Sequence, residues 1–187
     1  MKGVFYLFLA QIGFAFIGVF TKYVGSSVNA ITLSFFRVLI ASLFLISMAV
    51  ALKKTKQLSI NKRDIVPFYI IGVMFALNFV FFISAFSYTS LSEAGLITAF
   101  TPVFVYFLAS KFLKEKITRN GVFALFVVLF GLYVMNFTGI DPTHLFGNFL
   151  VLVSCVFAGV MIVYTKIEDR DHTALDVVFW PMVFAAA

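Results

Sequence analysis

Long apolar stretches alternate with short polar connections along almost the whole chain of 187 residues. A helix needs roughly 20 consecutive apolar residues to cross a bilayer core of about 30 Å. Backbone groups in lipid must be satisfied within each segment, and the stretches lack the alternation of a strand, so helices are expected. The candidate transmembrane helices are Gly3–Val24, Ile31–Leu52, Val66–Tyr88, Ala94–Phe112, Val122–Phe137, Asn148–Thr165 and Ala174–Ala187.

The composition places the chain in the same class. Hydrophobic residues make up 63% of the chain and charged residues 12%, whereas a soluble domain carries about 25% charged residues. Because so few charges cannot solvate a surface, we expect an all-α integral membrane protein, a multi-spanning helical bundle with the lipid bilayer as its main partner. The single cysteine, Cys155, excludes a disulfide within the chain. The sequence contains no phosphate-binding glycine loop, so the chain is not expected to hydrolyse ATP itself.

Basic residues lie in alternate connections between the apolar stretches. They crowd the second and fourth connections, at Lys53, Lys54, Lys56, Lys62 and Arg63 and at Lys111, Lys114, Lys116 and Arg119. Positively charged connections stay in the cytoplasm, so we expect a multi-pass protein of the plasma (inner) membrane with a cytoplasmic N-terminus. Topology thus explains the net charge of +6, and no nucleic-acid partner is expected. A signal peptide is disfavoured because the first stretch has no clear small-residue cleavage site.

The start of the chain resembles its end. Lys22 aligns with Lys166, a shift of 144 positions, and a Thr-Lys pair ends both helices. The repeat contains five helices, an odd number, so the second copy must enter the membrane from the opposite side, as in many secondary transporters. We therefore expect a first repeat over 1–140 and the start of a second over 145–187. Two full copies need about 290 residues and ten helices, so the chain is expected to be truncated and not to transport alone.

One region carries the pattern of a known family. The stretch Glu93–Met135 resembles the EamA-type repeat of the drug/metabolite transporter superfamily, in which small residues, a proline, an apolar run, a glutamate after a basic loop, a threonine and a glycine-bearing helix follow in order. These positions are Ala94, Pro102, Glu115, Thr118 and Gly131.

The second helix adds to this resemblance. Phe35, Phe36 and Arg37 are similar to the family's aromatic segment with an arginine near its start. The sequence departs from the pattern in three places: Phe14 stands where the family often has Trp, and Pro181 aligns with Arg37 of the first repeat. The third is the pair Gly121 and Gly131, which does not match the usual glycine spacing. The resemblance implies ten helices around a central cavity that moves amino acids, other metabolites or drugs, often outward.

Polar residues inside the apolar stretches are candidates for a substrate site, because they are costly in lipid. Gln11 and Asn78 lie near the middle of their helices, where they either line a cavity or form interhelical hydrogen bonds. Thr98 and Thr101 lie one turn apart just before Pro102, which can kink the helix. A hydroxyl-lined cavity wall is favoured there over threonines that bond their own backbone.

Two charged residues near helix starts leave alternatives open. Arg37 lies about two turns into its helix and either attracts anionic groups such as carboxylates or reaches outward as an anchor. Glu93 forms a capping box with Ser90, a role favoured over proton coupling or pairing with Arg37. His144 and His172 lie in connections without a partner pattern, so no metal site is expected.

The leading functional hypothesis is a secondary transporter that exports small metabolites such as amino acids by alternating access, without a cofactor. One alternative is a protein like the small multidrug-resistance pumps that acts as an oligomer, but those need a glutamate in the first helix, where this chain has Gln11. A membrane enzyme would need a cluster of His, Asp or Glu at membrane depth, which the sequence lacks. A non-transporting membrane assembly protein is the remaining alternative.

Overall fold

The structure is a computed structural model that describes residues 29–51, 62–114, 118–135, 142–170 and 172–186, with isolated positions between Phe5 and Val24. The predicted all-helical fold is confirmed over these residues. The first predicted span, Gly3–Val24, and Gln11 within it lie outside the continuous described ranges. The described helices are α2 (Ala30–Ala51), α3 (Ile65–Ala85), α4 (Leu91–Thr98), α5 (Thr101–Phe112), α6 (Arg119–Met135), the 3-10 helix η3 (Pro142–His144), α7 (Leu145–Glu168) and α8 (Ala174–Ala186).

The described residues contain four segments long and apolar enough to cross a membrane. These are Ile31–Met48, Ile65–Ala85, Leu91–Phe112 and Leu145–Glu168, and each coincides with a predicted span. The described part of α6 has 17 residues and that of α8 has 13 residues, at the positions of the two other predicted segments in this part of the chain.

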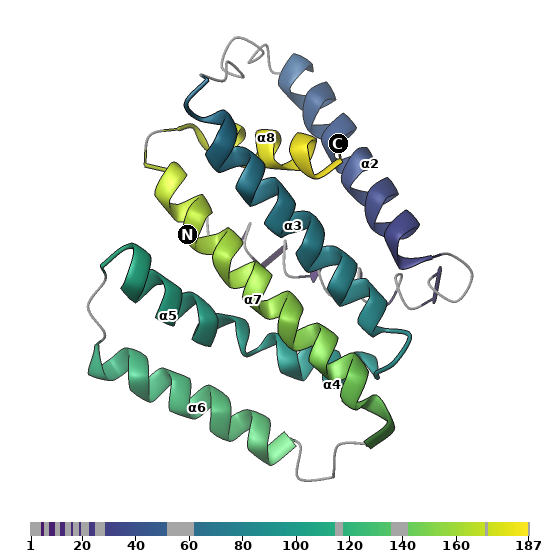
Figure 1. The fold of residues 1–187 in the computed structure, drawn as a ribbon, viewed down its shortest axis with the longest axis vertical. Helices are drawn as coiled ribbons and strands as arrows, with labels where there is room; N and C mark the ends of the chain where they lie inside the picture. The colour runs from purple at the N-terminus through teal and green to yellow at the C-terminus, as the bar shows by residue number, and fades with distance from the viewer. Residues whose placement is uncertain are drawn as a thin grey trace.

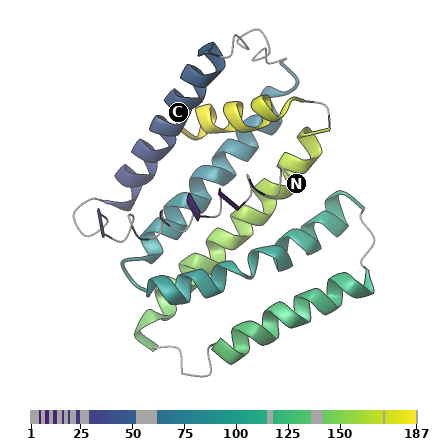
Figure 2. The ribbon, with the colours of Figure 1, turned by 180° about the vertical axis from the view of Figure 1, so that it is seen from behind.

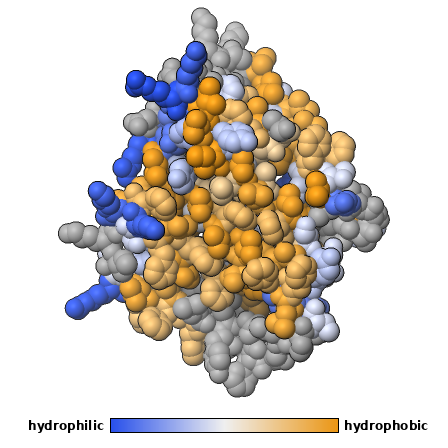
Figure 3. Space-filling view, viewed as in Figure 1, coloured by the Kyte–Doolittle hydropathy of each residue, from blue (hydrophilic) through white to orange (hydrophobic). Residues whose placement is uncertain are grey.

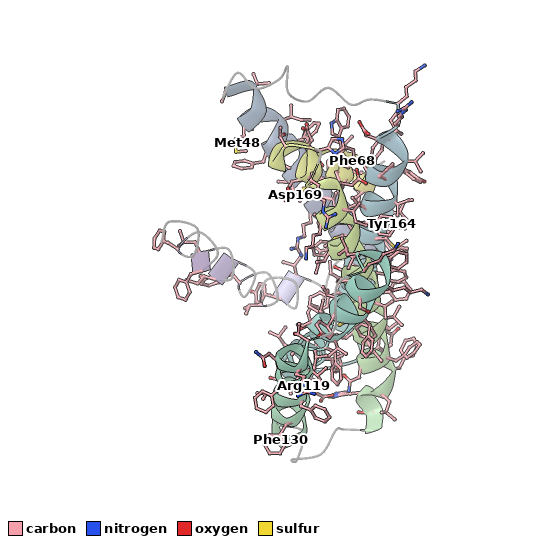
Figure 4. The ribbon with its side chains drawn as sticks, turned by 90° about the vertical axis from the view of Figure 1, so that its left-hand side faces the viewer. Met48, Phe68, Arg119, Phe130, Tyr164 and Asp169 are labelled. Carbon is pink, nitrogen blue, oxygen red and sulfur yellow. The ribbon has the colours of Figure 1, made fainter. Side chains whose placement is uncertain are left out.

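α7 is inserted among helices of the first predicted repeat. It contacts α3 on one side and α4 and α5 on the other, while α8 contacts α2 and α3. Figure 1 shows α2, α3, α7, α5 and α6 in this order across the molecule, and Figure 2 shows α8 lying against α2 and α3 on the opposite face. In the edge view, Met48 of α2 lies near the upper end, and Arg119 and Phe130 of α6 lie near the lower edge (Figure 4). The segments assigned to two repeats thus form one bundle.

Small residues allow the helices to approach closely. A Cβ atom on Gly72 of α3 would lie 2.6 Å from the carbonyl oxygen of Pro181 in α8, and one on Gly159 of α7 would lie 3.0 Å from the Cβ of Phe104 in α5. Contacts between small residues are the usual way in which membrane helices pack, because lipid supplies little hydrophobic drive for association. Two buried clusters lie along these seams: Ala85, Ala94, Val151 and Cys155, and Phe68, Ile71 and Val177.

The predicted fourth span is broken into α4 and α5 just before Pro102. Proline has no N–H for the carbonyl of Thr98 and its ring crowds the preceding turn. The chain closes the break with three-residue turns, in which the N–H groups of Ala99 and Phe100 donate to the carbonyls of Leu96 and Ile97. The break positions Thr98 and Thr101 on either side of an interrupted helix.

The two ends of the bundle differ in polarity. Figure 3 shows an apolar surface over most of the molecule and hydrophilic side chains along one edge. That edge is where α3 and α6 begin and where α5 and α7 end (Figure 1). The distribution agrees with the basic connections used to predict a cytoplasmic face, although the orientation in the membrane stays a prediction.

Candidate functional site

A groove runs along the break between α4 and α5 and the facing side of α7. Its volume is about 700 Å³. The lining residues come from α4, α5, α7 and the turn between α4 and α5, and they include Thr98, Thr101, Pro102, Tyr106, Ile162 and Lys166. The lining of the groove thus combines hydroxyls, an aromatic ring, an amine and apolar side chains. This combination suits a small solute with polar and apolar parts.

Thr98 and Thr101 are the two predicted site residues that the structure brings together in this groove. The Thr98 hydroxyl donates to the carbonyl of Gly95 at 2.6 Å, which is the local backbone contact considered as its alternative role. Its oxygen lone pairs remain acceptors. Lining the groove and bonding the backbone are therefore compatible for this residue.

Asn78 lies on the other side of α7, in the seam with α3. Its side-chain Nδ2 donates to the backbone carbonyl of Ser154 at 2.8 Å. An interhelical bond of this kind is worth about 0.6–2 kcal/mol in a membrane bundle. The amide therefore links α3 to α7, and it lies apart from the residues that line the groove.

Arg37 is also separate from the groove. Its guanidinium carbon lies 4.1 Å from the ring centroid of Phe79, which is a cation–π contact between α2 and α3. Its Nη1 atom is buried and has no hydrogen-bond partner among the described residues. Arg37 is therefore held against an aromatic ring of the neighbouring helix. The alternative of a pair between Arg37 and Glu93 is not seen among the described contacts, because the hydrogen bonds of the Glu93 carboxylate go to other residues.

Glu93 forms the predicted capping box at the start of α4. The N–H of Glu93 donates to Ser90 Oγ at 3.1 Å, and Ser90 Oγ donates to Glu93 Oε1 at 3.3 Å. The box at the start of α8 is formed as well, since the Asp176 N–H donates to Thr173 Oγ1 at 3.4 Å and the Thr173 N–H donates to Asp176 Oδ2 at 3.3 Å. Both boxes follow from sequence spacing alone.

Glu93 has additional contacts that its sequence neighbourhood did not predict. Asn148 Nδ2 donates to Glu93 Oε2 at 2.7 Å, and His144 Nδ1 lies 2.7 Å from Glu93 Oε1. Thr89 Oγ1 lies 2.5 Å from Asn148 Oδ1 and 3.4 Å from Glu93 Oε2. A hydroxyl has one hydrogen to donate, and the shorter contact is the better bond. We call Thr89, Ser90, Glu93, His144 and Asn148 the Glu93 cluster; it joins the start of α4 to the start of α7.

The second histidine lies in a comparable contact at the other end of α7. His172 Nε2 lies 3.3 Å from Asp64 Oδ2, and His172 Nδ1 lies 3.1 Å from the carbonyl oxygen of Glu168. The ring packs edge-on against Phe68, with centroids 5.0 Å apart. We call Asp64, Phe68, Glu168 and His172 the His172 cluster. Sequence reasoning missed Glu93 as the partner of His144 and Asp64 as a partner of His172, since both carboxylates are distant along the chain.

Protonation of His172 is favoured by its surroundings. Burial alone lowers the pKa of His172, but hydrogen bonds with the Asp64 carboxylate and the Glu168 carbonyl, together with the charges of both carboxylates, raise it above its ordinary value of about 6.5. Both ring nitrogens face oxygen acceptors, so the doubly protonated ring satisfies both contacts at once.

Comparison with known proteins gives a consistent assignment. Residues 1–137 match the EamA-like transporter family. The chain is 25% identical over 185 residues to the pseudopaline exporter CntI of Pseudomonas aeruginosa, which covers 98% of this chain and 63% of that protein. Two uncharacterised transporters of Bacillus subtilis are also similar: YetK, 26% identical over 147 residues (74% of this chain and 44% of YetK), and YcxC, 33% identical over 105 residues (54% and 33%).

The chain spans less than two thirds of the length of these curated relatives. The family match nevertheless covers most of the chain and includes α2 to α6. The apolar helices, the small-residue packing and this match agree with one another, and the protein belongs to the EamA-like transporter family.

Proposed function

We propose that the whole protein is a secondary transporter that exports small metabolites such as amino acids by alternating access between its two repeats. The observation that carries this proposal is the position of the groove between α4 and α5 of the first repeat and α7 of the second. A solute bound there contacts both repeats, so movement of one against the other can transfer its exposure from one side to the other. The similarity to an exporter of pseudopaline supports the outward direction.

The proposed substrate-binding residues are Gln11, Arg37, Asn78, Thr98 and Thr101. In this proposal, the two threonine hydroxyls bind polar groups of the solute in the groove, and Lys166 at the far end of the lining contributes positive charge. Arg37 would act from the α2–α3 side, where its buried Nη1 atom has no described partner. Asn78 would act indirectly, because its amide already fixes α7 against α3.

The test is an efflux assay on the whole protein with Thr98→Ala and Thr101→Ala combined. Cells are loaded with amino acids, and export is compared with wild type and with empty vector by mass spectrometry of the medium. Each lost hydrogen bond is worth about 0.5–1.5 kcal/mol, so the loss of two is expected to lower export about five- to a hundredfold at equal protein abundance.

Ser110→Ala is the matched control for this assay. The Ser110 hydroxyl bonds the carbonyl of Phe107 in its own helix, and Ser110 does not line the groove. Its export is expected to equal wild type. Unchanged export by the double variant would remove the threonines from the site, and wild-type export equal to empty vector for every amino acid would reject this substrate class.

A further inference from the structure

The Glu93 cluster is a polar junction between two segments that belong to different repeats. Thr89, Ser90 and Glu93 come from the α3–α4 connection and the first turn of α4, whereas His144 and Asn148 come from η3 and the first turn of α7. The Glu93 carboxylate accepts from Asn148 at 2.7 Å and from Ser90 at 3.3 Å, and its Oε1 lies 2.7 Å from His144 Nδ1. Three side chains thus converge on one carboxylate: Ser90 from the first predicted repeat, His144 from the connection that follows it, and Asn148 from the second predicted repeat.

The backbones beneath this cluster are in direct contact. A Cβ atom on Gly147 would lie 2.7 Å from the carbonyl carbon of Tyr88 and 2.8 Å from the backbone nitrogen of Thr89. The rings of Tyr88 and Phe146 pack edge to face, with centroids 5.0 Å apart. The junction therefore has a close fit, and the hydrogen bonds to Glu93 hold only while α7 stays seated on the α3–α4 connection.

The hydrogen-bond pattern requires a charged carboxylate. Ser90 Oγ and Asn148 Nδ2 both point donors at Glu93, and His144 Nδ1 joins them when it carries the ring hydrogen. An ionised carboxylate accepts all of these bonds, whereas a protonated one carries a hydrogen that competes with a donor. Adding a proton to Glu93 therefore removes the charge that strengthens these hydrogen bonds and weakens the contact between the two repeats.

Protons can reach this junction from water. The side chains of His144 and Glu93 are 31% and 18% exposed. Within the described part of the chain, His144 from η3 is the titratable group in contact with Glu93. Asn148 from α7 is neutral. Tyr88, in the connection between α3 and α4, is the next titratable side chain. The protonation state of the pair is therefore set mainly by Glu93 and His144 themselves.

We propose that Glu93 is the proton-binding residue that couples opening of this junction to transport. Ionised Glu93 holds the start of α7 against the start of α4, and a proton taken from water onto a carboxylate oxygen releases it. Apart from the transfer of this proton from hydronium to the carboxylate oxygen, no covalent bond is made or broken in this step. The inference rests on the proposed alternating-access function. With the topology predicted from the basic connections, the junction faces outward, and proton entry there opens the outer side as an exporter requires.

Capping alone does not account for this arrangement. The capping box of α8 has the same spacing, yet the described hydrogen bonds of Asp176 stay within its own segment, to Thr173. Asp176 is 6% exposed, and its Oδ1 atom has no partner in the described part of the structure. The capping hydrogen bonds of α8 thus form without contacts to another repeat. Asp176→Asn is therefore a matched control for Glu93→Gln.

The experiment measures the width of the junction as a function of pH. Spin labels are placed on the whole protein at Ser87→Cys and Leu145→Cys, two exposed positions on the two sides of the junction. The native Cys155 is 1% exposed, so labelling is directed to the introduced thiols. Distance distributions are recorded in lipid nanodiscs from pH 3 to pH 8.5, because a glutamate carboxylate takes up its proton at about pH 4.3 or below.

Wild type is expected to lose most of its short-distance population as the pH falls, a change of at least about tenfold in the ratio of the two populations for one proton-linked step. Glu93→Gln, which imitates the protonated acid, is expected to show the long distance at every pH, and Asp176→Asn to follow wild type. A pH-independent distribution in wild type, or a response in Glu93→Gln equal to wild type, would overturn the proposal.

A variant of His144 decides which of the two partners binds the proton. His144→Gln keeps a donor but cannot titrate, so the pH response should persist in this variant if Glu93 binds the proton. Loss of the response in His144→Gln would assign the proton to His144 and reject Glu93. The two measurements test the two proposals separately. Export by a protein whose junction distance does not change with pH rejects the proton step alone. A pH-dependent junction distance without export rejects the proposed transport function.

Discussion

Both ends of α7 contact neighbouring segments through carboxylates and a histidine, but the group at the centre of the contact differs. At its start, one carboxylate, Glu93, receives bonds from an amide, a hydroxyl and a histidine. At its end, one histidine, His172, lies between the carboxylates of Asp64 and Glu168. The first arrangement needs a negative charge at its centre and the second needs a positive one, so acid has opposite effects on them.

The sign of each effect follows from the group at the centre. The pKa of His172 is raised, so the stability that its charge contributes is fully present below about pH 6.5 and is lost as the pH rises through the raised value. Protonation of Glu93 instead weakens the hydrogen bonds that it accepts. A fall in pH therefore loosens the start of α7 and tightens its end. In the proposed alternating-access cycle, such opposite responses would prevent one change in pH from loosening both ends together.

The largest expected effect comes from Gly147→Ala, which forces the Glu93 cluster apart. The new Cβ would meet backbone atoms of Tyr88 and Thr89 at 2.7–2.8 Å, and backbone cannot rotate away as a side chain can. Overpacking of this kind costs about 1–3 kcal/mol. We expect a lower melting temperature in detergent and the long spin-label distance at every pH.

Gly95→Ala is the control for this substitution, because a Cβ at Gly95 meets nothing within 4 Å. It should melt at or slightly above the temperature of wild type, since alanine favours the helix. If Gly147→Ala melted like Gly95→Ala, the close fit at the start of α7 would be wrong.

A smaller effect is expected from Asn78→Leu, which changes a contact between α3 and the middle of α7. The substitution removes the hydrogen bond to the carbonyl of Ser154, at a cost of about 0.6–2 kcal/mol. Because this contact carries no charge, the melting temperature should fall by the same amount at pH 5.5 and pH 8. Export per folded molecule should stay near wild type if Asn78 acts through packing, and a loss of export without a loss of stability would instead place its amide against the solute.

The order of elements was largely predictable from the sequence, and the physical reason is the length of a bilayer-spanning helix. Apolar stretches of the right length predicted α2, α3, α6 and α7 with ends that differ by a few residues from those observed. Pro102 predicted the interruption of the fourth span, because it removes a backbone donor. The boxes at Glu93 and Asp176 were predictable because they depend on local spacing alone.

The contacts between distant segments were not predictable. A helix that is apolar on all sides has no amphipathic pattern to show which face packs against which neighbour. The sequence therefore did not predict that α7 packs between α3 and α5. The partners of His144 and Asn78 lie 51 and 76 positions away along the chain. For the candidate site, only the pairing of Thr98 with Thr101 was visible, since one turn of helix separates them. Arg37 and Phe79 meet only because α2 packs on α3.

The smallest expected effect tests the end of α7 that acid should tighten. His172→Gln removes the charge between Asp64 and Glu168 while keeping a polar side chain that fits beside Phe68. The contribution is about 1 kcal/mol or less, because charged contacts near water are screened. The melting temperature of wild type should fall modestly as the pH rises from about 6 to 8, while that of His172→Gln should stay level across the same range. Above this range the two proteins should converge, since neutral His172 has already lost the interaction. Identical pH dependence of the melting temperature in both proteins would mean that protonation of His172 does not contribute to stability. The claim that acid has opposite effects on the two ends of α7 would then be wrong.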